Sequence, residues 1–240
     1  MTNVASSFDP AALLAAAKSH LDERRWDEAE RHCRQVLQRD PDNADALGLL
    51  AAALSDGPGS AEAVPTLLRH LELRPDDGGS LHRLGRVRAE QGDAEAAARL
   101  LEQAACSLPD VAIIHNDLAV ILDRLGRAEQ ALAAADRAVA LDPGFAFAHG
   151  NRGLMLFNVR RFDEALDSEL KALAALEPGQ SQSRAAVMHT LAQAAAKAGR
   201  LDEAEAAIRA QVAADDDPLF LGPLAVLLDL QGRRDRKSVV

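Results

Sequence analysis

The 240-residue chain has very few aromatic residues and very few cysteines. Phe, Trp and Tyr together make up 3% of it, with one Trp and no Tyr, whereas apolar residues as a whole reach 48%. Because β-sheets favour β-branched and aromatic residues, this Ala- and Leu-rich composition favours close-packed helices. The two cysteines, Cys33 and Cys106, are expected to be buried or half-buried thiols, as is usual in a cytosolic protein.

Long apolar runs and an excess of basic residues are missing too. No run of about 18 apolar residues is present, so no membrane span is expected. The first residues show no basic stretch followed by an apolar one, so we expect no signal peptide and a cytoplasmic location. Lys and Arg number 27 against 37 Asp and Glu, which gives a net charge of −10. Surfaces that bind nucleic acid are basic, so a nucleic-acid partner is not expected.

What the sequence has in abundance is repetition with a period of 34 residues. Proline recurs at this spacing at Pro41, Pro75, Pro109 and Pro143. Alanine forms a second series with the same spacing: Ala29, Ala63, Ala97, Ala131 and Ala165. A fixed period of about 20–50 residues is typical of solenoids, in which small repeats stack around a continuous core.

Each period contains two helical patterns joined by a short turn. In the first unit, Asp9 precedes Pro10, which suits the start of a helix. A second helix is expected from Trp26, with Ala29 and Cys33 on its apolar face. A small residue occupies the same position of the period in four of the first helices: Ala51, Gly85, Ala119 and Gly153. We expect them to let the two helices of a pair approach closely.

The residues within the period resemble the tetratricopeptide repeat (TPR), whose pattern is W-x2-L-G-x2-Y, then A-x3-F, then P over about 34 residues. The third unit carries this pattern at Leu81, Leu84, Gly85, Ala97, Leu101 and Pro109. The fourth carries it at His115, Leu118, Ala119, Leu122, Ala131, Ala135 and Pro143. The chain is therefore similar to bacterial TPR proteins. The resemblance implies an all-α solenoid of antiparallel helix pairs that forms a right-handed superhelix.

We expect about six repeats and a terminal half-repeat after a short lead over residues 1–9. The array is expected to span residues 10–234, with repeats near 10–43, 44–77, 78–111, 112–145, 146–178 and 185–217 and a half-repeat over 218–234. Residues 235–240, DRKSVV, do not follow the repeat. They are either a natural cap or an artefact whose coding DNA resembles a sequencing adapter. In the second case the natural chain continues beyond Arg234, and this is the N-terminal TPR region of a longer protein.

Two stretches depart from the repeat. Pro65 either kinks a helix that begins at Ala61 or marks a helix that begins late, near Pro65 itself. The polar GQSQSR segment after Pro178 shifts the phase by about six residues. It is either a loop or the start of a longer first helix that reaches back over Ser181.

Known catalytic patterns are missing from the sequence. H-E-x-x-H, G-x-S-x-G, C-x-x-C and a phosphate-binding loop are all absent, so we predict no catalytic residue, cofactor or metal site. His115 and His149 share one position of the repeat. We expect them to fill an aromatic slot in the core rather than to bind a metal.

The TPR resemblance implies that the first helices line a concave groove for a peptide or protein segment, which would make the chain a non-catalytic interaction scaffold. The positions that face this groove in the family correspond here to His82, Arg83, Arg86, Asn116, Asp117, Val120, Asp123, Phe147, Asn151, Leu154, Phe157, His189, Thr190 and Gln193. We expect Phe147 and Phe157 to make apolar contacts. His115 should turn to the core, and Asn116 and Asp117 to the groove.

Arg83 and Arg86 have two open interpretations. They are suited to bind an acidic side chain or a terminal carboxylate. Alternatively, they simply pair with Asp117, Asp123 or Glu90.

Two specialised TPR grooves are not predicted. The carboxylate clamp of chaperone-binding members needs Lys and Asn where Leu14 and Lys18 stand. The asparagine ladder of O-linked N-acetylglucosamine transferases needs Asn in every repeat at a position where Asn151 alone fits.

Two further functions stay open. The first is the recognition region of a truncated TPR-sulfotransferase or TPR-glycosyltransferase, an idea that rests on family analogy. The second is self-association through the C-terminal helix, whose apolar face has no second helix to cover it. This face comprises Leu221, Leu224, Val226 and Leu228.

Overall fold

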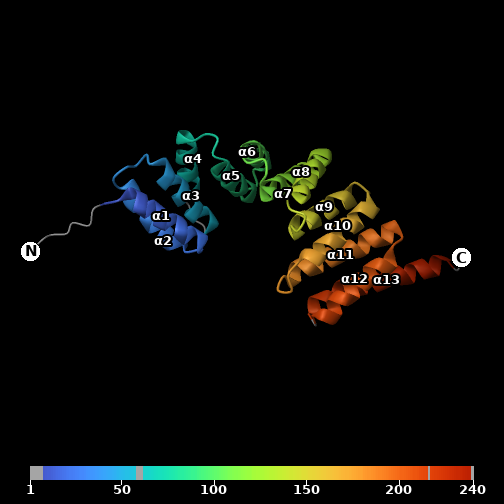
Figure 1. Cartoon of the computed structure of the whole chain (residues 1–240). Helices are drawn as coiled ribbons and strands as arrows, with labels where there is room; N and C mark the ends of the chain where they lie inside the picture. Colours follow the sequence, from blue (N-terminus) through green and yellow to red (C-terminus); the bar gives the residue numbers. More distant parts are fainter. Residues whose placement is uncertain (1–7, 58–61, 216, 239–240) are drawn as a thin grey trace, which may run out of the picture. The chain divides into compact units, whose positions relative to one another are not determined.

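The computed structural model describes residues 8–57, 62–215 and 217–238, and side chains as far as Gly232. Within these ranges all regular structure is helical, which confirms the predicted all-α class. Figure 1 follows the helices in chain order, from blue at α1 to red at α13. None of the described helices combines the length and hydrophobicity that crossing a membrane requires.

The chain divides into two compact units, Met1–Pro109 and Asp110–Val240. The first contains α1 (Pro10–Asp22), α2 (Trp26–Leu37), α3 (Ala44–Asp56), α4 (Ala63–Leu73), α5 (Gly78–Glu90) and α6 (Ala94–Ser107). The second contains α7 (Ala112–Arg124), α8 (Ala128–Leu141), α9 (Ala146–Asn158), α10 (Phe162–Ala175), α11 (Ser181–Ala198), α12 (Leu201–Ala214), a 3₁₀ turn at Pro218–Phe220 and α13 (Leu221–Ser238). In each unit a helix packs on its partner and on the next pair along the chain.

The alanine series forms the centre of these contacts. Ala29, Ala97, Ala131 and Ala165 are fully buried, and Ala63 is almost so. The small residues of the first helices lie directly against the second helices. A Cβ atom at Gly85 would lie 3.0 Å from Cγ of Leu101. The expected close approach is therefore confirmed in this pair, since a larger side chain would force the helices apart.

The turns inside the pairs share a backbone conformation. Gly92 and Gly126 have φ angles of +85° and +72°. Arg160, 34 residues after Gly126, adopts the same left-handed conformation with φ +66°, and Arg24 does so with φ +57°. Glycine adopts this conformation without strain, whereas an L-residue with a Cβ does not. Two of these turns are therefore strained.

For each of the two stretches that depart from the repeat, the structure agrees with one of the two predicted alternatives. Helix α4 begins at Ala63, so Pro65 lies in its first turn, where no helical N–H bond is lost. The late start is confirmed; Ala61 lies outside the described residues. Helix α11 begins at Ser181, so the longer first helix is also confirmed.

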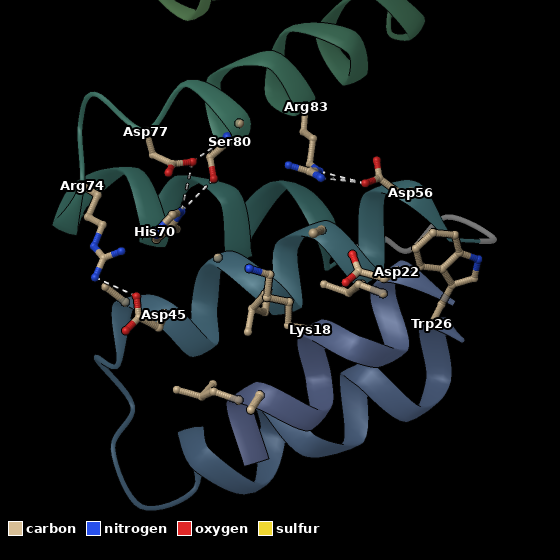
Figure 2. A pocket seen from close by; sticks show the side chains of 18 residues that line it. Lys18, Asp22, Trp26, Asp45, Asp56, His70, Arg74, Asp77, Ser80 and Arg83 are labelled. Atoms are coloured by element: carbon tan, nitrogen blue, oxygen red, sulfur yellow. Dashed lines mark hydrogen bonds and ion pairs between the residues drawn. The ribbon is translucent and has the colours of Figure 1, made fainter. Parts of the chain in front are cut away.

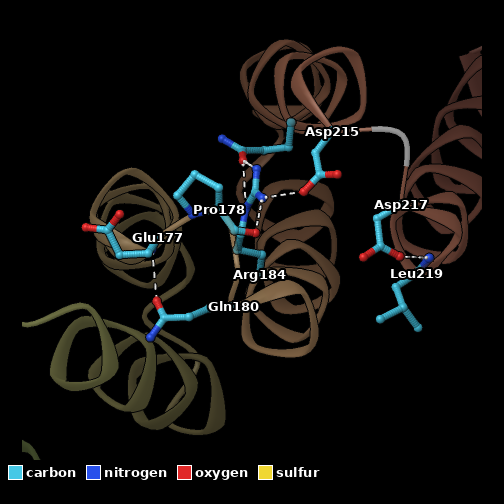
Figure 3. A network of polar contacts seen from close by, with 8 residues as sticks. Glu177, Pro178, Gln180, Arg184, Asp215, Asp217 and Leu219 are labelled. Atoms are coloured by element: carbon cyan, nitrogen blue, oxygen red, sulfur yellow. Dashed lines mark hydrogen bonds and ion pairs between the residues drawn. The ribbon is translucent and has the colours of Figure 1, made fainter.

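Arg184 fixes the start of α11 in place (Figure 3). Its side chain is only 4% exposed. Its guanidinium group donates to the carbonyl oxygen of Pro178 and to Oδ2 of Asp215, both at 3.1 Å, and to Oε1 of Gln211. It also lies over the ring of Phe220, 4.9 Å from the centroid. One buried arginine thus joins α11 to α12 and to the 3₁₀ turn.

The C-terminal helix is longer than expected from the sequence. It runs to Ser238, beyond the end of the expected half-repeat at residue 234, and residues 239–240 lie outside the described part. Phe220 and Leu227 are buried against the array, whereas Leu221 and Leu228 are 58% and 45% exposed. Asp217 caps the preceding turn by accepting the N–H of Leu219 at 2.9 Å, as expected for an acidic residue before Pro218.

The cysteines differ from the expectation in one respect. Both are free thiols, and Cys33 is buried in the core. Burial raises the pKa of the Cys33 thiol to about 12, so it stays protonated and unreactive near neutral pH. Cys106 is exposed, which contradicts the prediction that both thiols are at least half-buried. It lies near the end of α6, where the helix presents that position to solvent.

Candidate binding grooves on the first helices

The first unit contains a groove of about 710 Å³ on the face formed by α1, α3 and α5 (Figure 2). The side chains that line it are Leu14, Ala15, Lys18, Leu21 and Asp22 of α1, Ala44, Asp45, Gly48, Leu49, Ala52 and Asp56 of α3, and Gly79, Ser80 and Arg83 of α5, with Trp26, His70, Arg74 and Asp77 at its margins. Its lining contains both apolar and charged groups. Such a lining suits an extended peptide, which offers both kinds of group.

Arg83 enters this groove already paired with Asp56. Its Nε and Nη2 atoms lie 3.0 and 2.8 Å from Oδ2 of Asp56. Nη1 of Arg86 lies 3.8 Å from the other carboxylate oxygen of Asp56. The ion-pair partner of both arginines is therefore Asp56, rather than Asp117, Asp123 or Glu90. Two guanidinium groups thus share one carboxylate, and Glu90 lines the same small pocket beside the groove, which Arg86 does not line.

Further polar groups at the margin of the groove are held by one another. Arg74 pairs with Asp45 at 2.8 Å, and Nδ1 of His70 lies 2.7 Å from Oγ of Ser80 (Figure 2). Asp77 caps α5 by accepting the N–H of Ser80 at 2.8 Å. Burial lowers the pKa of His70, although the nearby Asp77 opposes this shift. His70 is therefore neutral near pH 7, and it forms part of the groove lining without contributing a charge.

Lys18 and Asp22 are the available charges in this groove. Both are exposed on α1, and within the described part of the chain neither makes a hydrogen bond or an ion pair. Leu14 and Lys18 occupy the two positions at which a carboxylate clamp would need Lys and Asn, and both line this groove. Asp22 was not predicted from the sequence. His82 is half-buried and does not line this groove.

The second unit contains a smaller pocket of about 210 Å³. It is lined by Phe147, Gly150, Asn151 and Leu154 of α9, by Glu169 and Leu176 at α10 and its end, and by Ser183, Ala186, Val187 and Thr190 of α11. Phe147, Asn151, Leu154 and Thr190 were named from the sequence, and the structure brings them together. Three other named residues do not line it: Phe157, His189 and Gln193. Phe157 instead packs edge-on against Phe162, with 5.4 Å between ring centroids.

The fourth repeat needs a correction. Asn116 was expected to face the groove, but it is 7% exposed and accepts a hydrogen bond from Nδ2 of Asn151 at 2.9 Å. It lies where α7 packs against α9, so its amide is enclosed. His115, expected in the core, is only half-buried. Asp117, Val120 and Asp123 are all half-buried on α7.

His149 fulfils the expectation of a buried histidine. Its Nε2 atom lies 3.0 Å from the carbonyl oxygen of Pro143, and burial lowers its pKa. No three His, Cys, Asp or Glu side chains among the described residues gather in a way that could hold a metal ion.

Glu169 is the residue that sequence analysis missed. Its side chain is 1% exposed, and burial raises the pKa of its carboxyl group to about 9. Its Oε2 atom has no hydrogen-bond partner in the described structure. Oε1 packs against Gly153, where a Cβ atom would come within 2.6 Å of it. The signal was present in the repeat, because the equivalent position holds an apolar or small residue elsewhere: Cys33, Leu67, Leu101, Ala135 and Ile208.

Comparison with known families agrees with this architecture. One tetratricopeptide-repeat model matches residues 82–146 and 124–181, and a second tetratricopeptide-repeat model matches residues 20–85. The chain therefore belongs to the tetratricopeptide-repeat family.

Several known proteins resemble parts of it. The TPR repeat-containing protein PA4667 of Pseudomonas aeruginosa is 38% identical over 100 residues, which cover 40% of this chain and 17% of that protein. The chain thus spans about a sixth of the length of this curated relative.

Solved structures share the fold at low identity. YrrB, described as a TPR protein with an unusual peptide-binding site, aligns with a TM-score of 0.63 and 19% identity over 79% of this chain and 96% of its own. MamA from Desulfovibrio magneticus RS-1 aligns with a TM-score of 0.61 and 22% identity over 71% and 97%.

Proposed function

We propose that the chain is a non-catalytic scaffold that binds an extended peptide segment of a partner protein in the groove of α1, α3 and α5. The observation that carries the proposal is this groove of about 710 Å³, which is lined by both apolar and charged side chains. The peptide-binding site named for the structurally similar YrrB supports the same kind of function.

The arrangement of charges in the groove predicts what it selects. Lys18 and Asp22 stand one helical turn apart on α1, without partners in the described structure. A ligand with an acidic and a basic side chain at matching spacing would satisfy both. Leu14 and Leu49, which also line the groove, offer apolar contact. The Arg83–Asp56 pair would limit the groove on the α5 side.

Selection from a library of random dodecapeptides displayed on phage tests this proposal. Selected peptides are then measured by fluorescence anisotropy against the wild type and Lys18→Glu. Reversing one groove charge should weaken binding of acid-containing peptides by about tenfold, the range expected for a partly screened charge pair.

Arg99→Glu provides the matched control. Arg99 is an exposed basic residue of the same unit, but it lies on the second helix α6, outside the groove. The Arg99→Glu substitution should leave the affinity for the selected peptides unchanged. Equal effects of the two reversals would show that net charge alone drives binding, and the groove assignment would then be lost.

A second candidate function is self-association through α13. Leu221 and Leu228 are exposed on this helix, and a second copy of the chain would bury them. Sedimentation velocity over a hundredfold range of concentration should reveal a dimer that Leu221→Asp/Leu228→Asp abolishes. A wild-type monomer at every concentration would contradict this candidate.

A further inference from the structure

The pocket between α9 and α11 contains one acidic residue among otherwise uncharged ones. Nine of its ten lining residues are apolar, glycine, amide or hydroxyl residues, and the tenth is the acidic Glu169. We propose that this pocket is a subsite for a lysine or arginine side chain of the bound partner, with the cationic group paired to Glu169. The inference deepens the proposed peptide-binding function and rests on it for the identity of the partner as a peptide.

The carboxyl group of Glu169 is buried, and one of its oxygen atoms has no hydrogen-bond partner in the described structure. A buried polar atom without a partner is costly, and native proteins rarely retain one without a reason. Oε2 of Glu169 is such an atom, although the side chain is almost fully enclosed by α9 and α11. The other five repeats show that the position accepts an apolar or small residue. The acid is therefore not required to build the repeat, and a ligand donor would satisfy it.

The lining of the pocket combines apolar side chains with one acid. Phe147, Leu154 and Val187 line it together with Glu169. Lysine and arginine combine an aliphatic stem with a charged end, so they match a lining of apolar side chains and one acid. A purely apolar side chain would leave Oε2 without a partner.

The net charge of the whole chain also favours a cationic ligand. A net charge of −10 attracts cationic segments and repels anionic ones. None of the ten residues that line the pocket is basic, so an incoming cation meets no like charge there.

Binding of a cation to Glu169 has a proton balance that can be measured. The free site holds a neutral carboxyl group near pH 7, since burial keeps its pKa at about 9. When an ammonium group enters, the O–H bond of Glu169 breaks, its proton passes to the buffer, and the carboxylate and the ammonium group remain as a pair. Below the pKa of the free site, affinity should therefore rise by about tenfold per pH unit.

The other titratable groups of these three helices must be separated from Glu169. They are His149 and Arg152 on α9, Asp163, Glu164, Asp167 and Lys171 on α10, and Arg184, His189 and Lys197 on α11. Arg152 pairs with Asp136 and Arg184 with Asp215. Burial lowers the pKa of His149, so it stays neutral above pH 7. The Glu169→Gln variant keeps all of these groups and removes only the acid.

The test uses the full chain and two small probes, N-acetyl-lysine N-methylamide and its uncharged norleucine analogue. NMR titrations at pH 6, 7 and 8 measure the affinity of each. The lysine probe should bind about tenfold more tightly for each pH unit, while the norleucine probe binds weakly and without pH dependence. The ¹³C shift of the Glu169 carboxyl group should move from its protonated to its ionised value when the lysine probe binds at pH 7.

Two variants make the test specific. Glu169→Gln should abolish the pH dependence and lower the affinity for the lysine probe by at least about tenfold. Glu129→Gln, an exposed acid on α8 of the same unit, should change neither. Circular dichroism confirms that both variants are folded.

The proposal fails if the lysine probe does not bind, if both probes bind equally, or if Glu169→Gln binds the lysine probe as the wild type does. These results leave the groove of the first unit untouched, because the selected peptides and Lys18→Glu report on it separately. Conversely, the phage library could yield no peptide while the lysine probe still binds. This result would overturn the proposed peptide-binding function and leave the Glu169 subsite standing.

Discussion

Replacing Glu169 with Gln should stabilise the chain at neutral pH, although it removes an ionisable group from a charged protein. Glu169 packs against Gly153 with its carboxyl group enclosed, and it must take up a proton to fold. Glutamine has nearly the same shape and needs no proton. The substitution therefore isolates the free energy of protonating the buried acid.

The magnitude follows from the two pKa values. The folded pKa is about 9 and the reference value is 4.5, so the folded pKa is raised. The neutral form is then fully available below pH 4.5, and its contribution to stability is lost as the pH rises toward 9. Each pH unit above the reference value costs about 1.4 kcal/mol. At pH 7 the wild type should therefore be destabilised by about 3 kcal/mol relative to pH 4 through this group.

Urea unfolding followed by circular dichroism measures this difference. Glu169→Gln should match the wild type near pH 4 and be more stable by about 3 kcal/mol at pH 7. Glu129→Gln, which changes an exposed acid, should follow the wild type at both values. If Glu169→Gln is no more stable than the wild type at pH 7, the chain folds without protonating Glu169. The carboxyl group would then not be in the buried, unpaired environment described above.

Three other substitutions test separate parts of the structure. Arg184→Ala should lower the free energy of unfolding by about 2–4 kcal/mol, because it removes a buried side chain together with its hydrogen bonds to Pro178, Gln211 and Asp215. Urea unfolding measures this loss, and Arg184→Lys should restore less than half of it. Arg160→Gly should raise the melting temperature, with a gain of about 0.5–1 kcal/mol, since its turn has a positive φ angle that glycine adopts freely; a loss of stability would contradict the strain. The lowered pKa of His70 predicts that stability falls as the pH drops below 6.5, and His70→Asn should make the fall shallower in the same unfolding assay.

The repeat period predicted the fold because few residue types satisfy each position. Alanines in the second helices and glycine or alanine in the first are set by the distance between packed helices, so their spacing reveals the pairs. Pro65 and the GQSQSR segment were ambiguous, since a proline is compatible with both the first turn of a helix and a kink. Those choices depend on packing around Arg184 and α4 that a local pattern does not contain.

The candidate site was predicted less completely. Positions in the repeat located Phe147, Asn151, Leu154 and Thr190, which line one pocket. The pairing of Arg83 with Asp56 was missed because it joins two repeats 27 residues apart in the sequence. Glu169 was missed for another reason: a glutamate in a helix is ordinarily taken as a surface residue. Comparing it with the equivalent position of every other repeat would have identified a buried acid.

The central claim is that the faces of α1, α3 and α5 bind a peptide, and site-specific photocrosslinking tests it most directly. A benzophenone amino acid is placed at Leu49 in the groove or at Arg99 on α6, and each chain is irradiated with a selected biotinylated peptide. The account predicts a crosslink from position 49 that excess unlabelled peptide suppresses, and none from position 99. A crosslink from position 99 alone would place the peptide on the second helices and contradict the account.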